Sequence, residues 1–343
     1  MLLHIFYKYL HTFSVGRIFL RTIMKHIIAA LILIPALAWA WQPPAGKPVT
    51  ATVGFAPGSG NEVSFRIVAA QVEKSNPKLT FVVQNKPGAG EIPGVNWFAQ
   101  QNTNGSNLYI ASQQGLFTAT EQWYPGQLRI NPMDMEFVTT IAKSPLALVA
   151  NINSKVNTPE QMIQLLKNPQ APVNVAIGAT AHRIVLEYLM DHVRGDRKLV
   201  QAVLYKGPAQ AVQDVAGNQA EFGIMPIAIA KPLIDAGRVK PIAITSEQRL
   251  SKIPKVPLWK DYVPGLNVYA AWMIMLPPGT PREQIDYYNK LFVPAINSAE
   301  SLKLFEENLM FTVRSEQTTE GARAYISRLQ TQWIPYTRKI TPN

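Results

Sequence analysis

The chain contains no cysteine, and this absence excludes several kinds of chemistry. Disulfides, thiolate nucleophiles and cysteine-containing metal sites all require that residue. Histidine is also scarce, with five among 343 residues. Beyond residue 40 only His182 and His192 remain, ten positions apart, which is not the spacing of a helical zinc motif. We therefore expect no metal site and no cofactor.

Sequence motifs for nucleotide binding and for nucleophilic catalysis are missing as well. Residues 87–94 read PGAGEIPG, in which the glycines fall one position out of the dinucleotide-binding fingerprint. No glycine-rich loop is followed by the GK[ST] of a nucleotide-binding P-loop. Gly58-Ser59-Gly60 lacks the flanking residues of a G-x-S-x-G nucleophile elbow. These absences predict a protein that is not an enzyme.

Long hydrophobic runs are absent after residue 40. The one apolar run before it, at 27–37, follows Lys25 and precedes Ala-Trp-Ala at 38–40. A short basic segment, an apolar core and a small-x-small site are the parts of a signal peptide. An uncleaved membrane anchor within 1–40 is the alternative interpretation. The prediction is an extension at 1–23, a start at Met24, cleavage after Ala40 and a mature, exported chain from Trp41.

Acidic residues are fewer than basic ones, and the net charge is +11. Residues 1–40 hold four basic residues and no acid, so the remainder carries +7, from 29 basic and 22 acidic residues. No block of five or more basic residues occurs. Nucleic-acid partners are usually met by such blocks or stripes. We expect no nucleic-acid partner, but a mildly basic protein that attracts anions.

Short apolar runs alternate with helical patterns from residue 49 onward. This order is typical of α/β folds with right-handed crossovers and a mainly parallel sheet. Thr158 and Thr280 each precede a Pro and a Glu or Gln in the manner of a helix N-cap. The predicted strands are 50–55, 79–83, 108–111, 146–150, 173–177, 203–205, 221–225, 239–245, 269–276 and 311–313, and the last three predicted helices are 281–296, 299–308 and 319–334.

No further set of strands is predicted beside the C-terminal helices. The simplest arrangement packs these helices against the first set of strands. This gives a discontinuous lobe 1, at 41–144 and 270–343, and an inserted lobe 2, at 145–269. Two chain crossings between α/β lobes make a hinge, and ligands bind in the cleft beside such a hinge.

Three loops of small residues follow predicted strands, at 56–61, 87–90 and 178–180. Each precedes a predicted helix, so backbone N–H groups and the positive end of a helix dipole favour an anion there. Taken singly, each loop also fits a tight turn that needs glycine. Taken together, they indicate a carboxylate site that uses no buried arginine.

A series of motifs along the chain resembles the periplasmic substrate-binding subunits of tripartite tricarboxylate transporters, the Bug family. The resemblance covers about 47–333. The motifs are VGFAPGSG at 53–60, VQNKPGAG at 83–90, YKG at 205–207, AGRV at 236–239, AITS at 243–246 and LPPGTP at 276–281.

The resemblance implies an α/β, type II periplasmic binding protein fold with two lobes and a two-crossing hinge. It implies a monomer in the periplasm that captures a small carboxylate for uptake, with membrane transporter subunits as candidate partners. A receptor that presents its ligand to a sensor protein is the alternative function. An enzyme acting on a small carboxylate is less favoured.

By position in the motifs, the resemblance also names candidate ligand-binding residues. His182 is expected to brace its loop, with a hydrogen bond to the ligand as the alternative. Where many relatives carry an Asp that can face an amino group, this chain has Met225. We expect Met225 to line the cleft and to favour an apolar or aromatic carboxylate over an amino acid. The candidates are Ser59, Gly60, Asn61, Ala89, Gly90, Ser112, Gly178, Thr180, His182, Tyr205 and Met225.

Overall fold

The structure is a computed structural model that describes residues 41–44 and 46–338. The predicted extension and signal peptide lie outside the described residues. None of the helices in the described part combines the length and the hydrophobicity that a membrane span requires. From Gln42 onward, the described residues belong to one compact unit.

The strands form one mixed sheet. Its strands are β1 (Val49–Val53), β2 (Phe81–Asn85), β3 (Asn107–Ser112), β4 (Glu136–Asn151), β5 (Val173–Ile177), β6 (Val200–Leu204), β7 (Phe222–Pro226), β8 (Val239–Ile244) and β9 (Tyr269–Leu276). Their order is β2-β1-β3-β9-β4-β7-β5-β6, and β8 also pairs with β4. The neighbours of β1 and of β5 are parallel, whereas β4 and β9 pair antiparallel with each neighbour. The expected mainly parallel sheet is therefore correct only for the two outer sets of strands.

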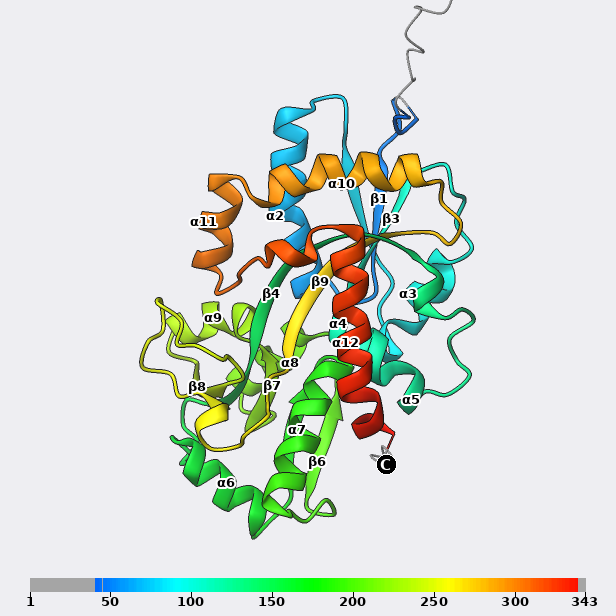
Figure 1. Cartoon of the computed structure of the whole chain (residues 1–343). Helices are drawn as coiled ribbons and strands as arrows, with labels where there is room; N and C mark the ends of the chain where they lie inside the picture. The colour runs from blue at the N-terminus through cyan, green and yellow to red at the C-terminus, as the bar shows by residue number, and fades with distance from the viewer. Residues whose placement is uncertain (1–40, 45, 339–343) are drawn as a thin grey trace, which may run out of the picture. The chain divides into compact units, whose positions relative to one another are not determined.

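Strand β4 joins these two sets. Its first part, Glu136 to Pro145, pairs with β9, and its second part, Leu146 to Asn151, pairs with both β7 and β8. In Figure 1 the two long strands run side by side between the upper and lower elements. The sequence predicted only a strand at 146–150. The first part of β4 was not predicted, because its polar residues interrupt the apolar pattern of a buried strand. The lobe boundaries themselves remain a prediction.

Those polar residues of β4 are buried with partners from the C-terminal part. Lys143 Nζ lies 2.6 Å from Glu316 Oε1, and Thr139 donates to the carbonyl of Gln317 at 3.1 Å. A buried ion pair needs such close geometry, because removing either partner leaves a costly unpaired charge. These contacts hold the returning C-terminal segment against β4.

Helices cover the sheet on its faces. They are α2 (Gly60–Ser75), α3 (Ile92–Phe98), α6 (Pro159–Lys167), α7 (Thr180–Val193), α8 (Pro208–Ala216), α9 (Ile227–Asp235), α10 (Arg282–Ile296), α11 (Ala299–Glu307) and α12 (Thr319–Thr337). Thr158 caps α6 as predicted, accepting from Gln161 N. The predicted Thr280 cap is wrong, because α10 begins after Pro281 and the Thr280 hydroxyl donates to Pro277 O at 2.7 Å. The strand predicted at 311–313 is a single bridge between Phe311 and Lys143.

Short helical turns after β3 lead toward the candidate site. They are α4 (Gln113–Gly115), a π-helical turn η2 (Leu116–Thr120) and α5 (Glu121–Trp123). Helix α12 packs along them in Figure 1. Thr337 at its end donates to Thr118 O at 2.6 Å and accepts from Trp123 Nε1, at its carbonyl, at 3.2 Å. The end of α12 thus fixes one wall of the candidate site.

Candidate functional site

Two adjoining cavities lie where the loops of the two strand sets meet. The first, called the inner cavity, has a volume of about 20 Å³ and is lined mostly by buried residues, including Gly60, Asn61, Ser112, Gln114, His182 and Trp272. The second, called the outer cavity, has a volume of about 340 Å³, and its wall includes Ala89, Gly90, Trp123, Thr180, Arg183 and Lys206. Phe55 and Ala179 belong to both walls.

The structure gathers most of the predicted ligand-binding residues around these cavities. Ser59 and Met225 are not among the described residues that line either one. Contact with ligand stays a prediction for the others. Gly60, Asn61, Ser112 and His182 line the inner cavity, and Ala89, Gly90, Gly178, Thr180 and Tyr205 line the outer cavity.

The loop between β1 and α2 uses several of its polar groups internally. Ser59 is the N-cap of α2 and accepts from Glu62 N at 3.5 Å, while the Glu62 carboxylate accepts from Gly58 N at 3.3 Å. A side-chain cap and an acidic residue in the first turn both satisfy a helix N-terminus. Asn61 Nδ2 donates to Ile110 O at 2.8 Å. The start of α2 is therefore occupied by the protein's own groups, which the sequence did not predict.

Gly60 is required here for a close approach. A Cβ at position 60 would lie 2.1 Å from the Trp272 ring, closer than any real contact. The indole of Trp272 is buried and forms part of the inner wall. Gly60 therefore serves first to seat Trp272 against the loop.

Behind Ser112 lies a buried carboxyl group, Glu91. Its oxygens accept from Tyr109 OH at 3.2 Å, from Ser112 N at 3.3 Å and from the Ser112 hydroxyl. Burial raises the pKa of Glu91 to about 8, against the opposing effect of the Ser112 hydrogen bonds. The residue has φ of 78°, a left-handed conformation rare for a side chain other than Gly or Asn. At neutral pH, Glu91 is thus an uncharged group that holds Ser112 in place.

His182 braces the third loop, as predicted. Its Nδ1 accepts from Gly178 N at 3.3 Å, so the ring proton lies on Nε2. Burial lowers the pKa of His182 to about 3, so the ring is neutral. Because the ring also lines the inner cavity, its Nε2–H remains a candidate donor to a ligand.

The start of α7 is open toward both cavities. Its N-cap, Ala179, provides no capping side chain, and Ala179, Thr180 and Ala181 contribute to the cavity walls. The helix has 14 residues, so its first N–H groups carry the positive end of a full dipole. Unlike α2, this helix end has no side-chain cap, and of its first N–H groups His182 N donates to Ala179 O at 3.1 Å.

Contacts across the site show that the loops of the two strand sets touch. Ala56 N donates to Lys206 O at 3.3 Å. A Cβ at Gly115 would lie 2.2 Å from the Thr180 hydroxyl, so Gly115 permits the approach of α4 to α7. The cavities are therefore bordered by loops of both strand sets.

Met225 occupies the hydrophobic core rather than the cleft. It is fully buried in β7, opposite Ala147 of β4, in a cluster that includes Val149 and Val215. Successive side chains of a strand point to opposite faces, and it is the next residue, Pro226, that lines the inner cavity. This placement does not support the expected contact between Met225 and a ligand.

Two residues of the walls were missed at the sequence level. Gln114 is buried in the inner wall, and its Nε2 has no hydrogen-bond partner among the described residues. Arg183 lies in the outer wall, whereas the sequence predicted a site that uses no buried arginine. Both lie close in sequence to predicted features. Gln114 comes two residues after the end of β3, and Arg183 is next to His182. Polar side chains just after a strand or in a first helical turn were the available signal.

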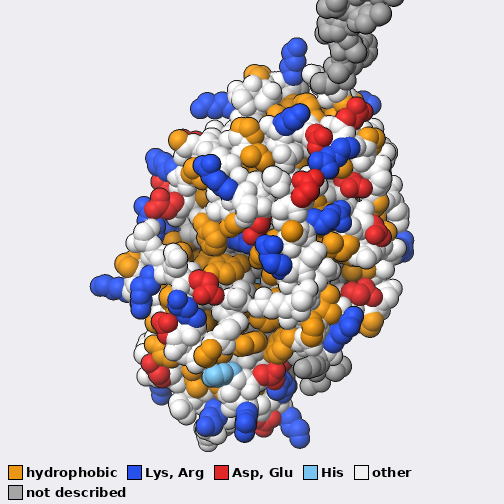
Figure 2. Space-filling model, viewed as in Figure 1, with side chains coloured by type: hydrophobic (Ala, Val, Ile, Leu, Met, Phe, Trp, Pro, Cys, Tyr) orange, Lys and Arg blue, Asp and Glu red, His pale blue; other side chains and the backbone are white. Residues whose placement is uncertain are grey.

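On the face that Figure 2 displays, charged side chains do not gather in one area. Basic and acidic side chains are interspersed there, and hydrophobic side chains gather near the middle of that face.

Residues 64–321 match the family model described as "Tripartite tricarboxylate transporter family receptor". The chain belongs to this family. The receptor is similar to protein BugT of Bordetella pertussis (strain Tohama I), with 24% identity over 294 residues, 85% of this chain and 89% of BugT. Its fold is that of solved periplasmic binding proteins with two lobes, as the resemblance implied.

Two solved structures illustrate the likeness of fold. MatC of Rhodopseudomonas palustris, determined with bound malate, has a TM-score of 0.78 and 21% identity, and the match covers 84% of the receptor and 98% of MatC. An R. palustris protein determined with adipate has a TM-score of 0.80 and 20% identity, covering 87% and 99%.

Proposed function

We propose that this receptor captures a small carboxylate between its two lobes and releases it unchanged. The observation that carries the proposal is the uncapped start of α7, which faces both cavities. Backbone N–H groups at a helix N-terminus bind carboxylates without needing a charged side chain. The malate and adipate in the two solved relatives support the same class of ligand.

Binding without turnover fits the chemistry of the inner wall. A nucleophilic serine needs a neighbouring base, whereas the carboxyl group beside the Ser112 hydroxyl has a pKa raised to about 8 and is mostly protonated at neutral pH. His182 uses Nδ1 to accept from Gly178 N and has a pKa of about 3, too low for a general base at neutral pH. These groups support a role in shaping the site.

The proposed location is the periplasm, reached through the predicted signal peptide at 24–40. Family membership supports this location, and it supports membrane transporter subunits as partners. We propose that the receptor acts as a monomer and delivers its ligand to those subunits.

A thermal-shift screen of the purified protein against mono-, di- and tricarboxylates, aromatic acids and amino acids tests the function. A ligand that binds only the folded state at about 100 times its Kd adds about 2.7 kcal/mol to the stability. We expect a rise in Tm of several degrees with one class of carboxylate. NMR of the same mixtures should show the acid unchanged. Folded, ligand-free protein that responds to no acid would contradict the proposal.

A further inference from the structure

The outer cavity has a charge that the inner cavity lacks. Arg183 and Lys206 line it, and none of the described residues in its wall is acidic. The Arg183 side chain is only 12% exposed, while Lys206 is exposed on the loop before α8. A guanidinium that is this little exposed is poorly hydrated. An anion bound in the cavity would therefore interact favourably with it.

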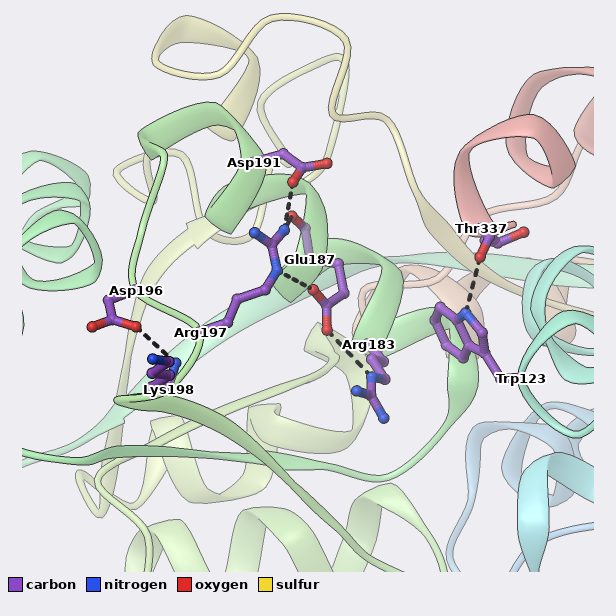
Figure 3. Close-up of polar contacts among 8 residues, drawn as sticks. All are labelled: Trp123, Arg183, Glu187, Asp191, Asp196, Arg197, Lys198 and Thr337. Atoms are coloured by element: carbon purple, nitrogen blue, oxygen red, sulfur yellow. Dashed lines mark hydrogen bonds and ion pairs between the residues drawn. The ribbon is translucent and has the colours of Figure 1, made fainter. Parts of the chain in front are cut away.

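Glu187 satisfies only part of Arg183. Its Oε1 accepts from Arg183 Nε at 3.3 Å, and its Oε2 accepts from Arg197 Nε at 3.1 Å, so one carboxylate serves two arginines. Figure 3 shows the Nε of Arg183 directed at Glu187 and its terminal nitrogens pointing away. Guanidinium groups bind carboxylates with two parallel N–H donors. Arg183 thus keeps that pair of donors for a ligand.

The remaining wall of the outer cavity is rich in aromatic rings. Trp123 lies with its ring centre 5.5 Å from Arg183 Cζ and uses its N–H for Thr337 O. Tyr205 donates its hydroxyl to Asp214 at 2.8 Å, which leaves the ring as the surface it offers the cavity. Such rings favour an apolar or planar body that lies between polar ends.

We propose that Arg183, assisted by Lys206, binds a second acidic group of the ligand. The ligand is then a diacid whose two carboxylates are separated by an apolar or aromatic body. This inference rests on the proposed function, because the first carboxylate is the one held at the start of α7. It replaces Met225 with Arg183 as the residue that selects among carboxylates.

Isothermal titration calorimetry at pH 7.5 with matched pairs of acids tests the inference. The pairs are terephthalate with 4-methylbenzoate, and adipate with hexanoate, which differ in the second carboxylate alone. We expect one diacid to bind at least tenfold more tightly than its monoacid. Arg183→Gln should remove that preference, a loss of about tenfold to a hundredfold for a hydrogen bond to a charged group. It should weaken the monoacid far less than the diacid, and Lys206→Gln should weaken the diacid only a few-fold.

Arg197→Gln is the matched control, because Arg197 also pairs with Glu187 but does not belong to the described wall of either cavity. It should keep the preference for the diacid. Equal affinity for diacid and monoacid in the unaltered protein would overturn the inference and leave the proposed function standing. An equal loss for both acids in Arg183→Gln would overturn it too, since Arg183 would then only support the site. Binding of no acid at all would overturn the proposed function itself.

Discussion

The inner and outer cavities adjoin, share two wall residues and are built on the same loops, yet they differ in charge. The inner wall holds Asn61, Ser112 and His182, whose hydrogen bonds are largely directed into the protein. The outer wall holds Arg183 and Lys206. The inner cavity can therefore select by shape and by a few neutral donors, while the outer cavity selects by charge.

This difference shows how a site for anions can be assembled around an inner wall that carries no charge. Two titratable groups next to the inner cavity, Glu91 and His182, are both uncharged at neutral pH because burial disfavours their charged forms. An uncharged wall costs little to close around a ligand. The arginine stands where the wall is still partly open to water.

The largest expected effect on stability comes from ionising Glu91. A charged Glu91 would place a negative charge beside the inner cavity and leave the charge of the outer cavity unchanged. Its folded pKa of about 8 lies above the usual 4.5, so the unfolded chain loses this proton first. The stability from Glu91 is therefore complete below pH 4.5 and lost as the pH rises to 8. The loss is on the order of 5 kcal/mol, since one pKa unit is about 1.4 kcal/mol. Affinity for a carboxylate should fall above pH 8 as well.

Urea unfolding and calorimetry of the protein and of Glu91→Gln, from pH 5 to 9, measure both changes. Tyr109, which also faces Glu91, has a pKa raised by burial and stays protonated over this range. The difference between the two unfolding curves should therefore report Glu91 alone. Parallel curves for the two proteins would show that Glu91 is already ionised at neutral pH.

Much of the fold could be predicted because local patterns agreed with it. The Thr158 cap and Gly-rich turns follow from short-range chemistry, and most strands fell within a residue or two of their predicted bounds. The first part of β4 could not be predicted, because its buried polar residues depend on partners such as Glu316, more than 170 positions away. The Thr280 cap failed for a related reason, since a nearby carbonyl competes for its hydroxyl.

The site was predictable at the level of loops and less so at the level of side chains. The three small-residue loops do meet, but sequence gives no sign of which groups turn inward. Ser59 has its oxygen committed to Glu62 N, and Met225 points into the core. Arg183 was missed because its role depends on Glu187 and Trp123, which fix its direction.

A second, smaller effect on stability should follow from Gly60→Ala, which changes the wall of the inner cavity and not that of the outer cavity. The new Cβ would collide with Trp272, and overpacking a buried contact typically costs 1–3 kcal/mol. We expect the free energy of unfolding to fall by about 2 kcal/mol and carboxylate binding to weaken. Thermal and urea unfolding measure the first, and calorimetry the second.

Gly207→Ala is the matched control for Gly60→Ala. A Cβ at position 207 would lie 3.5 Å from Ala56, which is ordinary contact. Its backbone is extended, with φ of 175°, so alanine adopts it without strain. If Gly207→Ala were as damaging as Gly60→Ala, the close seat of Trp272 would not be the cause.

The smallest expected effect concerns Gln114 in the inner wall. Here the substitution should raise the stability of the protein, whereas the preceding changes lower it. Its buried Nε2 has no partner in the described part of the chain, and an unsatisfied buried donor costs about 1–3 kcal/mol. Gln114→Met keeps the length of the side chain and removes that donor. We expect the ligand-free protein to become about 1 kcal/mol more stable, while its affinity for the carboxylate falls by about tenfold.

The neighbouring Gln113 provides the comparison for this last change. It is buried and donates to Thr140 Oγ1 at 2.7 Å, but it is not among the described residues that line the inner cavity. Gln113→Met should therefore leave the affinity unchanged. A gain in stability with no loss of affinity in Gln114→Met would mean that the ligand never reaches this amide. A loss of both would mean that the amide already has a partner, such as a bound water, and that the inner wall is satisfied before any ligand arrives.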